Sequence, residues 1–86
     1  MTDNTDELIR EVLADQGHLA VNTADLSDST DLYGAGLTSH ASVNVMLALE
    51  DAFDIEFPDR LLRKSTFANI ATIRDAIVEL TEEAAS

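Results

Sequence analysis

Apolar residues recur at the spacing of an amphipathic helix in three segments of the chain. We expect one helix over Thr5 to Gln16, a second from about Ser39 to Phe53, and a last one that begins near Asn69 to Thr72. The positions that we expect to be buried are Leu8, Ile9, Val12 and Leu13 in the first helix, Val45, Met46, Leu49, Ala52 and Phe53 in the second, and Ile70, Ile73, Ile77 and Leu80 in the last. No segment shows the alternation typical of a strand, so the pattern predicts an all-α fold.

Glycine, proline and capping residues mark the ends of these helices. Gly17 follows the first helix as a stop signal, and Pro58 is well placed to open a short third helix. Thr72 and Asp75 have the spacing of a capping box at the start of the last helix. We expect the tail from Thr81 to Ser86 to fray.

A long polar stretch, His18 to Thr38, joins the first two helices. It is rich in Asp, Asn and Ser, which favour turns, and structureless loops of this length are uncommon in compact domains unless they are functional. The stretch also contains apolar residues that we expect to lie on the core: Leu19, Val21, Leu26, Leu32 and Tyr33. We therefore predict a single domain, residues 1–86, built as a small four-helix bundle of three main helices and a short third helix, with a long loop between helices 1 and 2.

Seventeen acidic residues stand against five basic ones, and the net charge is −12. Such a surface repels DNA, RNA and anionic membranes, and it attracts basic patches on other proteins. Acidity alone also serves simply to keep a small protein soluble. The N-terminus lacks the basic region of a secretory signal, and the longest apolar run, Val45 to Leu49, is far too short to cross a bilayer. We expect a soluble cytoplasmic monomer that binds neither nucleic acid nor membrane.

The chain offers little for a metal site or for catalysis. It contains no cysteine, which excludes disulfides, thiolate metal sites and a cysteine nucleophile. The Asp-rich loop fails the EF-hand pattern whether it is counted from Asp25 or from Asp28, and the two histidines, His18 and His40, lie in unrelated segments. His40 cannot readily take the proton of Ser39, because neighbouring residues on a helix point about 100° apart. We expect no metal, no catalytic residue and no enzymatic activity.

Ser39 stands where a glycine-containing loop meets the second helix. A helix N-terminus has unpaired N–H groups and the positive end of the helix dipole, so a phosphate attached to Ser39 would be stabilised there. The simpler interpretation is that Thr38 or Ser39 caps the helix. The local pattern alone favours the cap over a modification site.

Two longer segments change this balance: residues 31–43, DLYGAGLTSHASV, and residues 47–59, LALEDAFDIEFPD. Together with the length, the acidity and the helix order, they make the chain resemble the acyl carrier and peptidyl carrier protein family over nearly its whole length. The resemblance implies that a separate phosphopantetheinyl transferase attaches 4′-phosphopantetheine from coenzyme A to Ser39. The thiol of this arm would hold an acyl or aminoacyl cargo as a thioester and present it to partner enzymes.

The chain departs from the family pattern on both sides of the serine. The family has Asp before the serine, where this chain has Thr38, and Leu after the serine, where it has His40. The family often has an acidic residue five positions after the serine, and this position is Asn44 here. The region of the third helix, usually acidic in fatty acid carriers, contains Arg60, Arg63 and Lys64. These departures argue against the housekeeping carrier of fatty acid synthesis.

The chain looks most like stand-alone bacterial carriers that are charged with an amino acid by a ligase related to seryl-tRNA synthetases. A stand-alone carrier for nonribosomal peptide, polyketide or fatty acid synthesis is the alternative within the family. An acidic helical interaction module without a covalent arm is the alternative of a different class.

In the carrier family, the second helix is the main docking surface for partner enzymes. The resemblance therefore implies partner contacts at Thr38, His40, Asn44, Leu47, Glu50 and Asp51. The expected partners are the transferase, an amino acid or acyl ligase, and a downstream acceptor enzyme.

Overall fold

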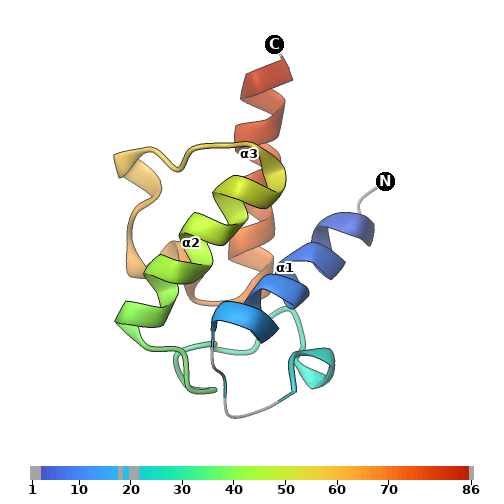
Figure 1. The fold of residues 1–86 in the computed structure, drawn as a ribbon, viewed down its shortest axis with the longest axis vertical. Helices are drawn as coiled ribbons and strands as arrows, with labels where there is room; N and C mark the ends of the chain where they lie inside the picture. The colour runs from blue at the N-terminus through green and yellow to red at the C-terminus, as the bar shows by residue number, and fades with distance from the viewer. Residues whose placement is uncertain (1–2, 18, 20–21, 86) are drawn as a thin grey trace.

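In the computed structural model, which describes residues 3–17, 19 and 22–85, the chain forms three α-helices and three 3₁₀ turns (Figure 1). The helices are α1 (Asp3–Gln16), α2 (Ser39–Phe53) and α3 (Ile70–Ala85), and the turns are η1 (Thr23–Asp25), η2 (Asp59–Leu61) and η3 (Lys64–Phe67). The all-α fold and the long loop between α1 and α2 are confirmed. The short third helix takes the form of the two 3₁₀ turns η2 and η3. No helix in this part of the chain is both long and apolar enough to cross a membrane.

The core forms where α1 packs against both α2 and α3. Leu8 and Val12 of α1, which we expected to be buried, are only half-buried. The other residues of the expected apolar stripes of α1 and α3 are buried, and the central ones lie fully out of solvent. These residues are Ile9 and Leu13 of α1 and Ile70, Ile73 and Ile77 of α3. Burial of such large aliphatic side chains is the main stabilising term for a domain of this size.

The buried face of α2 differs in part from the expected one. Val45 and Leu49 are fully buried as predicted, and Ala41 joins them. Ala52, which we expected to be buried, is exposed, and Met46 and Phe53 are only partly buried against the core. The apolar residues of α2 surround much of the helix, so the sequence pattern does not single out the face that α1 covers.

The long loop lies on the core as predicted. The loop residues Leu26 and Leu32 are buried in the core, and Leu19 and Tyr33 are partly buried against it. Val21, the remaining apolar residue that we expected on the core, lies outside the described residues. Two backbone hydrogen bonds join the loop to the end of η3 and to the start of α3. The Leu32 N–H donates to the Ala68 carbonyl at 2.7 Å, and the Ala71 N–H donates to the Asp28 carbonyl at 3.1 Å.

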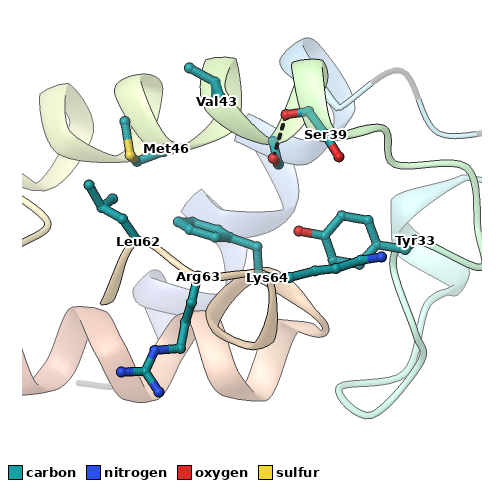
Figure 2. Close-up of a pocket in the computed structure, with 9 residues that line it drawn as sticks. Tyr33, Ser39, Val43, Met46, Leu62, Arg63 and Lys64 are labelled. Atoms are coloured by element: carbon teal, nitrogen blue, oxygen red, sulfur yellow. Dashed lines mark hydrogen bonds between the residues drawn. The ribbon is translucent and has the colours of Figure 1, made fainter. Parts of the chain in front are cut away.

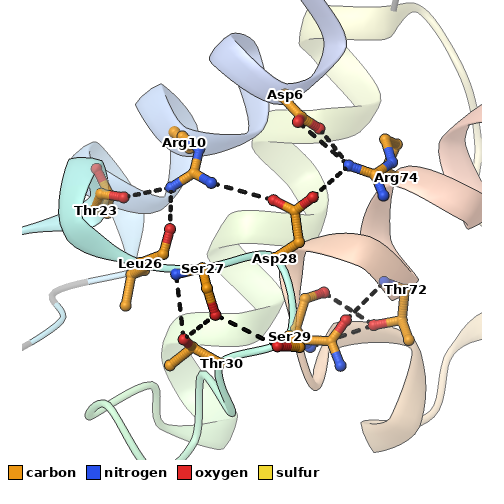
Figure 3. A network of polar contacts seen from close by, with 11 residues as sticks. Asp6, Arg10, Thr23, Leu26, Ser27, Asp28, Ser29, Thr30, Thr72 and Arg74 are labelled. Atoms are coloured by element: carbon orange, nitrogen blue, oxygen red, sulfur yellow. Dashed lines mark hydrogen bonds and ion pairs between the residues drawn. The ribbon is translucent and has the colours of Figure 1, made fainter. Parts of the chain in front are cut away.

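Arg10 of α1 fastens the loop from the other side (Figure 3). One of its terminal nitrogens, Nη1, donates to the carbonyl oxygens of Thr23 and Leu26, at 2.6 and 2.8 Å. The other, Nη2, donates to the Asp28 carboxylate at 3.2 Å. A single guanidinium therefore satisfies two loop carbonyls and one loop carboxylate, which suits its planar, multi-donor geometry.

Arg74 of α3 completes this polar cluster, which consists of Asp6, Arg10, Asp28 and Arg74 (Figure 3). Its Nη1 donates to both carboxylate oxygens of Asp6, at 2.9 and 3.2 Å, and to Asp28 at 3.0 Å. The hydrogen bonds to Asp6 and then to Asp28 raise the pKa of the Arg74 guanidinium above its ordinary value. The cluster thus ties α1, the loop and α3 together.

Two features at the ends of α3 differ from the sequence expectation. The predicted capping box of Thr72 and Asp75 is wrong, because the box lies one turn earlier. The Thr72 N–H donates to Asn69 Oδ1 at 2.8 Å, and the Asn69 N–H donates to Thr72 Oγ1 at 3.2 Å. The expected fraying from Thr81 is also not observed, since α3 continues to Ala85; Ser86 lies outside the described residues.

Candidate functional site

Thr38 is the N-cap of α2, and this assignment resolves which of the two hydroxyls caps the helix. Its backbone is extended, and its Oγ1 accepts a hydrogen bond from the Ala41 N–H at 3.0 Å. Ser39 is the first residue of the helix and is exposed. Gly36, just before this point, has φ 118°, a conformation that favours glycine and lets the loop turn into the helix.

The hydroxyl of Ser39 takes no part in the local hydrogen bonding. Ser42, one turn later, donates from its Oγ to the backbone carbonyl of Ser39 at 2.7 Å (Figure 2). Within the described residues, no hydrogen bond involves Ser39 Oγ. An exposed hydroxyl at the first position of a helix is free to accept a covalent group without loss of a structural contact.

Ser39 borders an apolar cavity of about 320 Å³ between α2 and the segment that carries η2 and η3 (Figure 2). The cavity is lined by Tyr33, Ser39, Ser42, Val43, Met46, Leu62, Arg63, Lys64 and Phe67. Phe67 also packs on Phe57 with a ring-centroid distance of 5.5 Å and an interplanar angle of 57°. This aromatic pair, a favourable tilted arrangement, holds the wall of the cavity in place opposite α2.

Lys64 and Tyr33 meet at one end of this cavity. The Lys64 ammonium lies 4.8 Å from the centroid of the Tyr33 ring, within the range of a cation–π contact. The site therefore combines a free hydroxyl, an apolar hollow and a cation.

The partner residues expected from the sequence fall into two groups. His40, Leu47 and Asp51 are exposed along one face of α2, and Thr38 is exposed at its start. Asn44 and Glu50 are half-buried. Their role in binding partner enzymes stays a prediction.

Glu50 has a structural contact that the sequence did not indicate. Its Oε2 accepts a hydrogen bond from the Phe57 N–H at 2.8 Å, and its backbone carbonyl accepts from the Ile55 N–H at 3.0 Å. Glu50 therefore shapes the chain after α2, where it turns toward η2.

The sequence analysis missed two exposed apolar residues beside the site. Val43 is 50% exposed and Leu62 46% exposed, close to the 53% of Leu47. A signal for Val43 was present in its spacing, because it follows Ser39 by four residues and precedes Leu47 by four, and such positions share a helix face. Leu62 gave no comparable signal, since it comes next to this face only through the tertiary fold.

The arrangement suits a passive acceptor better than a catalyst. Within the described part of the chain, no hydrogen bond joins His40 to Ser39, and no three acidic or histidine side chains are grouped to hold a metal ion. A catalytic serine needs a base within hydrogen-bond reach.

Comparison with known proteins decides the family. A family model described as "Phosphopantetheine attachment site" matches residues 7–82. The chain belongs to the phosphopantetheine-binding carrier proteins. Membership confirms the cofactor expected from the sequence, 4′-phosphopantetheine, and confirms that the chain is a carrier and not an enzyme.

Relatives of this carrier protein include one from Agrobacterium fabrum named "Aminoacyl carrier protein". It is 52% identical over 69 residues, which are 80% of this chain and 83% of the relative. A carrier protein from Agrobacterium tumefaciens, solved in complex with an engineered Bradyrhizobium japonicum glycine:[carrier protein] ligase and ATP, superposes with a TM-score of 0.86 at 47% identity, covering 88% of this chain and 99% of that one. A glycylated carrier protein in complex with the Bradyrhizobium japonicum ligase superposes with a TM-score of 0.74 at 28% identity, covering 86% of this chain and 99% of that one.

Proposed function

We propose that this carrier protein holds an aminoacyl group as a thioester on a 4′-phosphopantetheine arm attached to Ser39. When bound, the arm supplies the thiol that the chain itself lacks, since it contains no cysteine. The proposal includes a cytoplasmic location, where a transferase can draw on coenzyme A.

One observation carries the assignment of Ser39 as the attachment residue. Thr38 already caps α2 through its hydrogen bond to the Ala41 N–H, so the Ser39 hydroxyl is exposed and has no structural duty. A phosphodiester on Ser39 would stand at the start of α2, where the helix dipole and unpaired N–H groups favour negative charge.

The aminoacyl cargo is supported by the relatives. One of them is named an aminoacyl carrier protein, and two were solved with a glycine:[carrier protein] ligase. We propose that a ligase of this kind loads the present chain with a small amino acid. A phosphopantetheinyl transferase would act before it, and an acceptor enzyme after it.

Intact mass spectrometry tests the attachment. The protein is incubated with coenzyme A and a broad-specificity phosphopantetheinyl transferase, beside Ser39→Ala and Ser42→Ala. We expect the wild type and Ser42→Ala to gain one phosphopantetheinyl group and Ser39→Ala to gain none. Ser42→Ala is the matched control because it removes a hydroxyl one helical turn away. No gain on the folded wild type would leave an acidic interaction module as the better explanation.

A second assay tests the cargo. The modified protein is incubated with ATP, a glycine:[carrier protein] ligase and a mixture of amino acids. We expect a mass gain of one small aminoacyl group that neutral hydroxylamine removes, because hydroxylamine cleaves thioesters. Loading by a fatty acyl ligase alone would contradict the aminoacyl assignment and leave the attachment intact.

A further inference from the structure

Most of the few cations in this acidic chain are held by other groups. Arg10 and Arg74 belong to the polar cluster, and Arg60 forms an ion pair with Glu79. The two that line the cavity beside Ser39 are Arg63 and Lys64. Lys64 is also the only lysine in the sequence.

These two cations are oriented differently (Figure 2). The Nε of Arg63 donates to the backbone carbonyl of Arg60 at 2.9 Å, and its guanidinium extends away from Ser39. The side chain of Lys64 runs toward Tyr33, and its ammonium lies over the ring. Among the described residues, Lys64 has no carboxylate partner, although the chain has an excess of twelve negative charges.

The present contact of Lys64 is a weak one for an ammonium. A cation–π contact at a solvent-accessible site is worth less than a charge-assisted hydrogen bond to a phosphate oxygen. Lysine is suited to such an exchange, because its charge sits at the end of a flexible four-carbon chain. Ser39 and Lys64 line the same cavity, so a phosphate on Ser39 and the flexible Lys64 side chain would border one hollow.

We propose that Lys64 binds the phosphodiester that joins the arm to Ser39, exchanging its contact with the Tyr33 ring for one with a phosphate oxygen. This inference rests on the proposed function, because it requires the arm on Ser39. Lys64 would hold the first part of the arm over the apolar cavity and offset its negative charge within a strongly acidic protein. Arg63 would take no direct part.

Thermal unfolding of the apo and phosphopantetheinylated forms tests the proposal. The midpoint Tm is measured for both forms of the wild type, Lys64→Met, Lys64→Arg and Arg63→Met. We expect the difference between the modified and apo Tm to be about 2 to 4 °C smaller in Lys64→Met than in the wild type, at low salt. Lys64→Arg should restore most of the difference, and high salt should diminish it in the wild type.

Arg63→Met is the matched control, since it removes the same charge from a neighbouring residue that lines the same cavity. We expect it to keep the wild-type difference. Each comparison is made within one variant, so a loss of stability common to both forms cancels.

The outcomes separate this inference from the proposed function. If mass spectrometry shows no arm on the wild type, both are overturned. If the arm is attached and Lys64→Met behaves like the wild type, the role of Lys64 is overturned and the proposed function stands. If the difference between the modified and apo Tm decreases equally in Arg63→Met and Lys64→Met, the effect is one of general charge. This outcome would also overturn the role of Lys64.

Discussion

Two neighbouring hydroxyl residues, Thr38 and Ser39, have different tasks at the start of α2. The Thr38 side chain satisfies a backbone N–H that the helix cannot satisfy itself. This leaves the Ser39 hydroxyl exposed and, within the described residues, without a hydrogen bond, so a change at this hydroxyl leaves the helix cap in place.

The division predicts opposite effects of two alanine substitutions. Thr38→Ala should lower the free energy of unfolding by about 1 kcal/mol, because it removes the N-cap. Ser39→Ala should change it little and should abolish attachment of the arm. Urea denaturation followed by circular dichroism measures the first effect, and intact mass measures the second. An equal loss of stability in the two variants would show that Ser39 also supports the helix.

At the scale of one element, α2 presents Val43 and Leu47 to solvent on the face that begins with Ser39. His40 and Asp51 are exposed beside them. An apolar strip, Val43 and Leu47, next to the acidic Asp51 suits a partner surface that is apolar at its centre and basic at its rim.

This face predicts that Leu47→Ala and Asp51→Lys each lower kcat/KM for loading by the ligase about 3- to 10-fold, while the fold stays intact. Asp75→Lys on α3 is the control for Asp51→Lys, because it makes the same charge change on an exposed residue of another helix. Steady-state loading assays with the modified protein provide the measurement. Unchanged kinetics in both α2 variants would show that the ligase docks on another surface.

The same helix shows how far the sequence predicts the structure. The bounds of α2 are predicted correctly, since helical periodicity and the loop before Ser39 agree. Its buried face is only partly predicted. Ala41 and Ala52 are equally small and apolar, yet the first is buried and the second exposed, a difference that arises from tertiary packing.

The start of α3 also shows a case in which the local sequence leaves two possibilities open. Asn69 with Thr72 and Thr72 with Asp75 both fit the spacing of a capping box. The loop decides between them, because the Ala71 N–H donates to the Asp28 carbonyl and so fixes the helix from its first turn. The cavity beside Ser39 likewise depends on a tertiary contact, that of Phe57 with Phe67, which no local pattern reveals.

At the scale of the whole molecule, the polar cluster adds to the apolar core, to which the loop contributes Leu26 and Leu32. Arg10 and Arg74 meet at Asp28, so α1, α3 and the loop are joined through one carboxylate (Figure 3). The raised pKa of Arg74 means that the contribution of its positive charge is complete below the ordinary arginine pKa and is lost as pH rises through the raised value, in strong alkali. Substitution of Arg74 therefore removes this charge at neutral pH.

Arg74→Met should lower the free energy of unfolding by about 1 to 2 kcal/mol, because it leaves two half-buried carboxylates without this donor. Arg60→Met should cost less than about 1 kcal/mol, since Arg60 and Glu79 form a more exposed ion pair. Chemical denaturation of the two variants under the same conditions makes the comparison. A larger loss in Arg60→Met would show that the cluster is not the main polar tie.

The net charge of −12 predicts the salt dependence of loading. An acidic carrier is steered toward a basic enzyme surface, so kcat/KM should fall several-fold as ionic strength rises from low to physiological values. Stopped-flow or initial-rate assays over a salt series measure this. Rates that do not depend on salt would indicate that docking is governed by the apolar strip of α2.

The hydrogen bonds between the loop and the start of α3 have a consequence for how long the loop stays folded. The Leu32 amide donates to the Ala68 carbonyl at 2.7 Å, and the Leu32 side chain is fully buried. Breaking this hydrogen bond requires that the loop leave the core, which is close to unfolding the whole molecule. In hydrogen–deuterium exchange, this amide should retain its proton as long as those inside α1. The part of the predicted loop around Leu32 would therefore stay closed as long as the core itself.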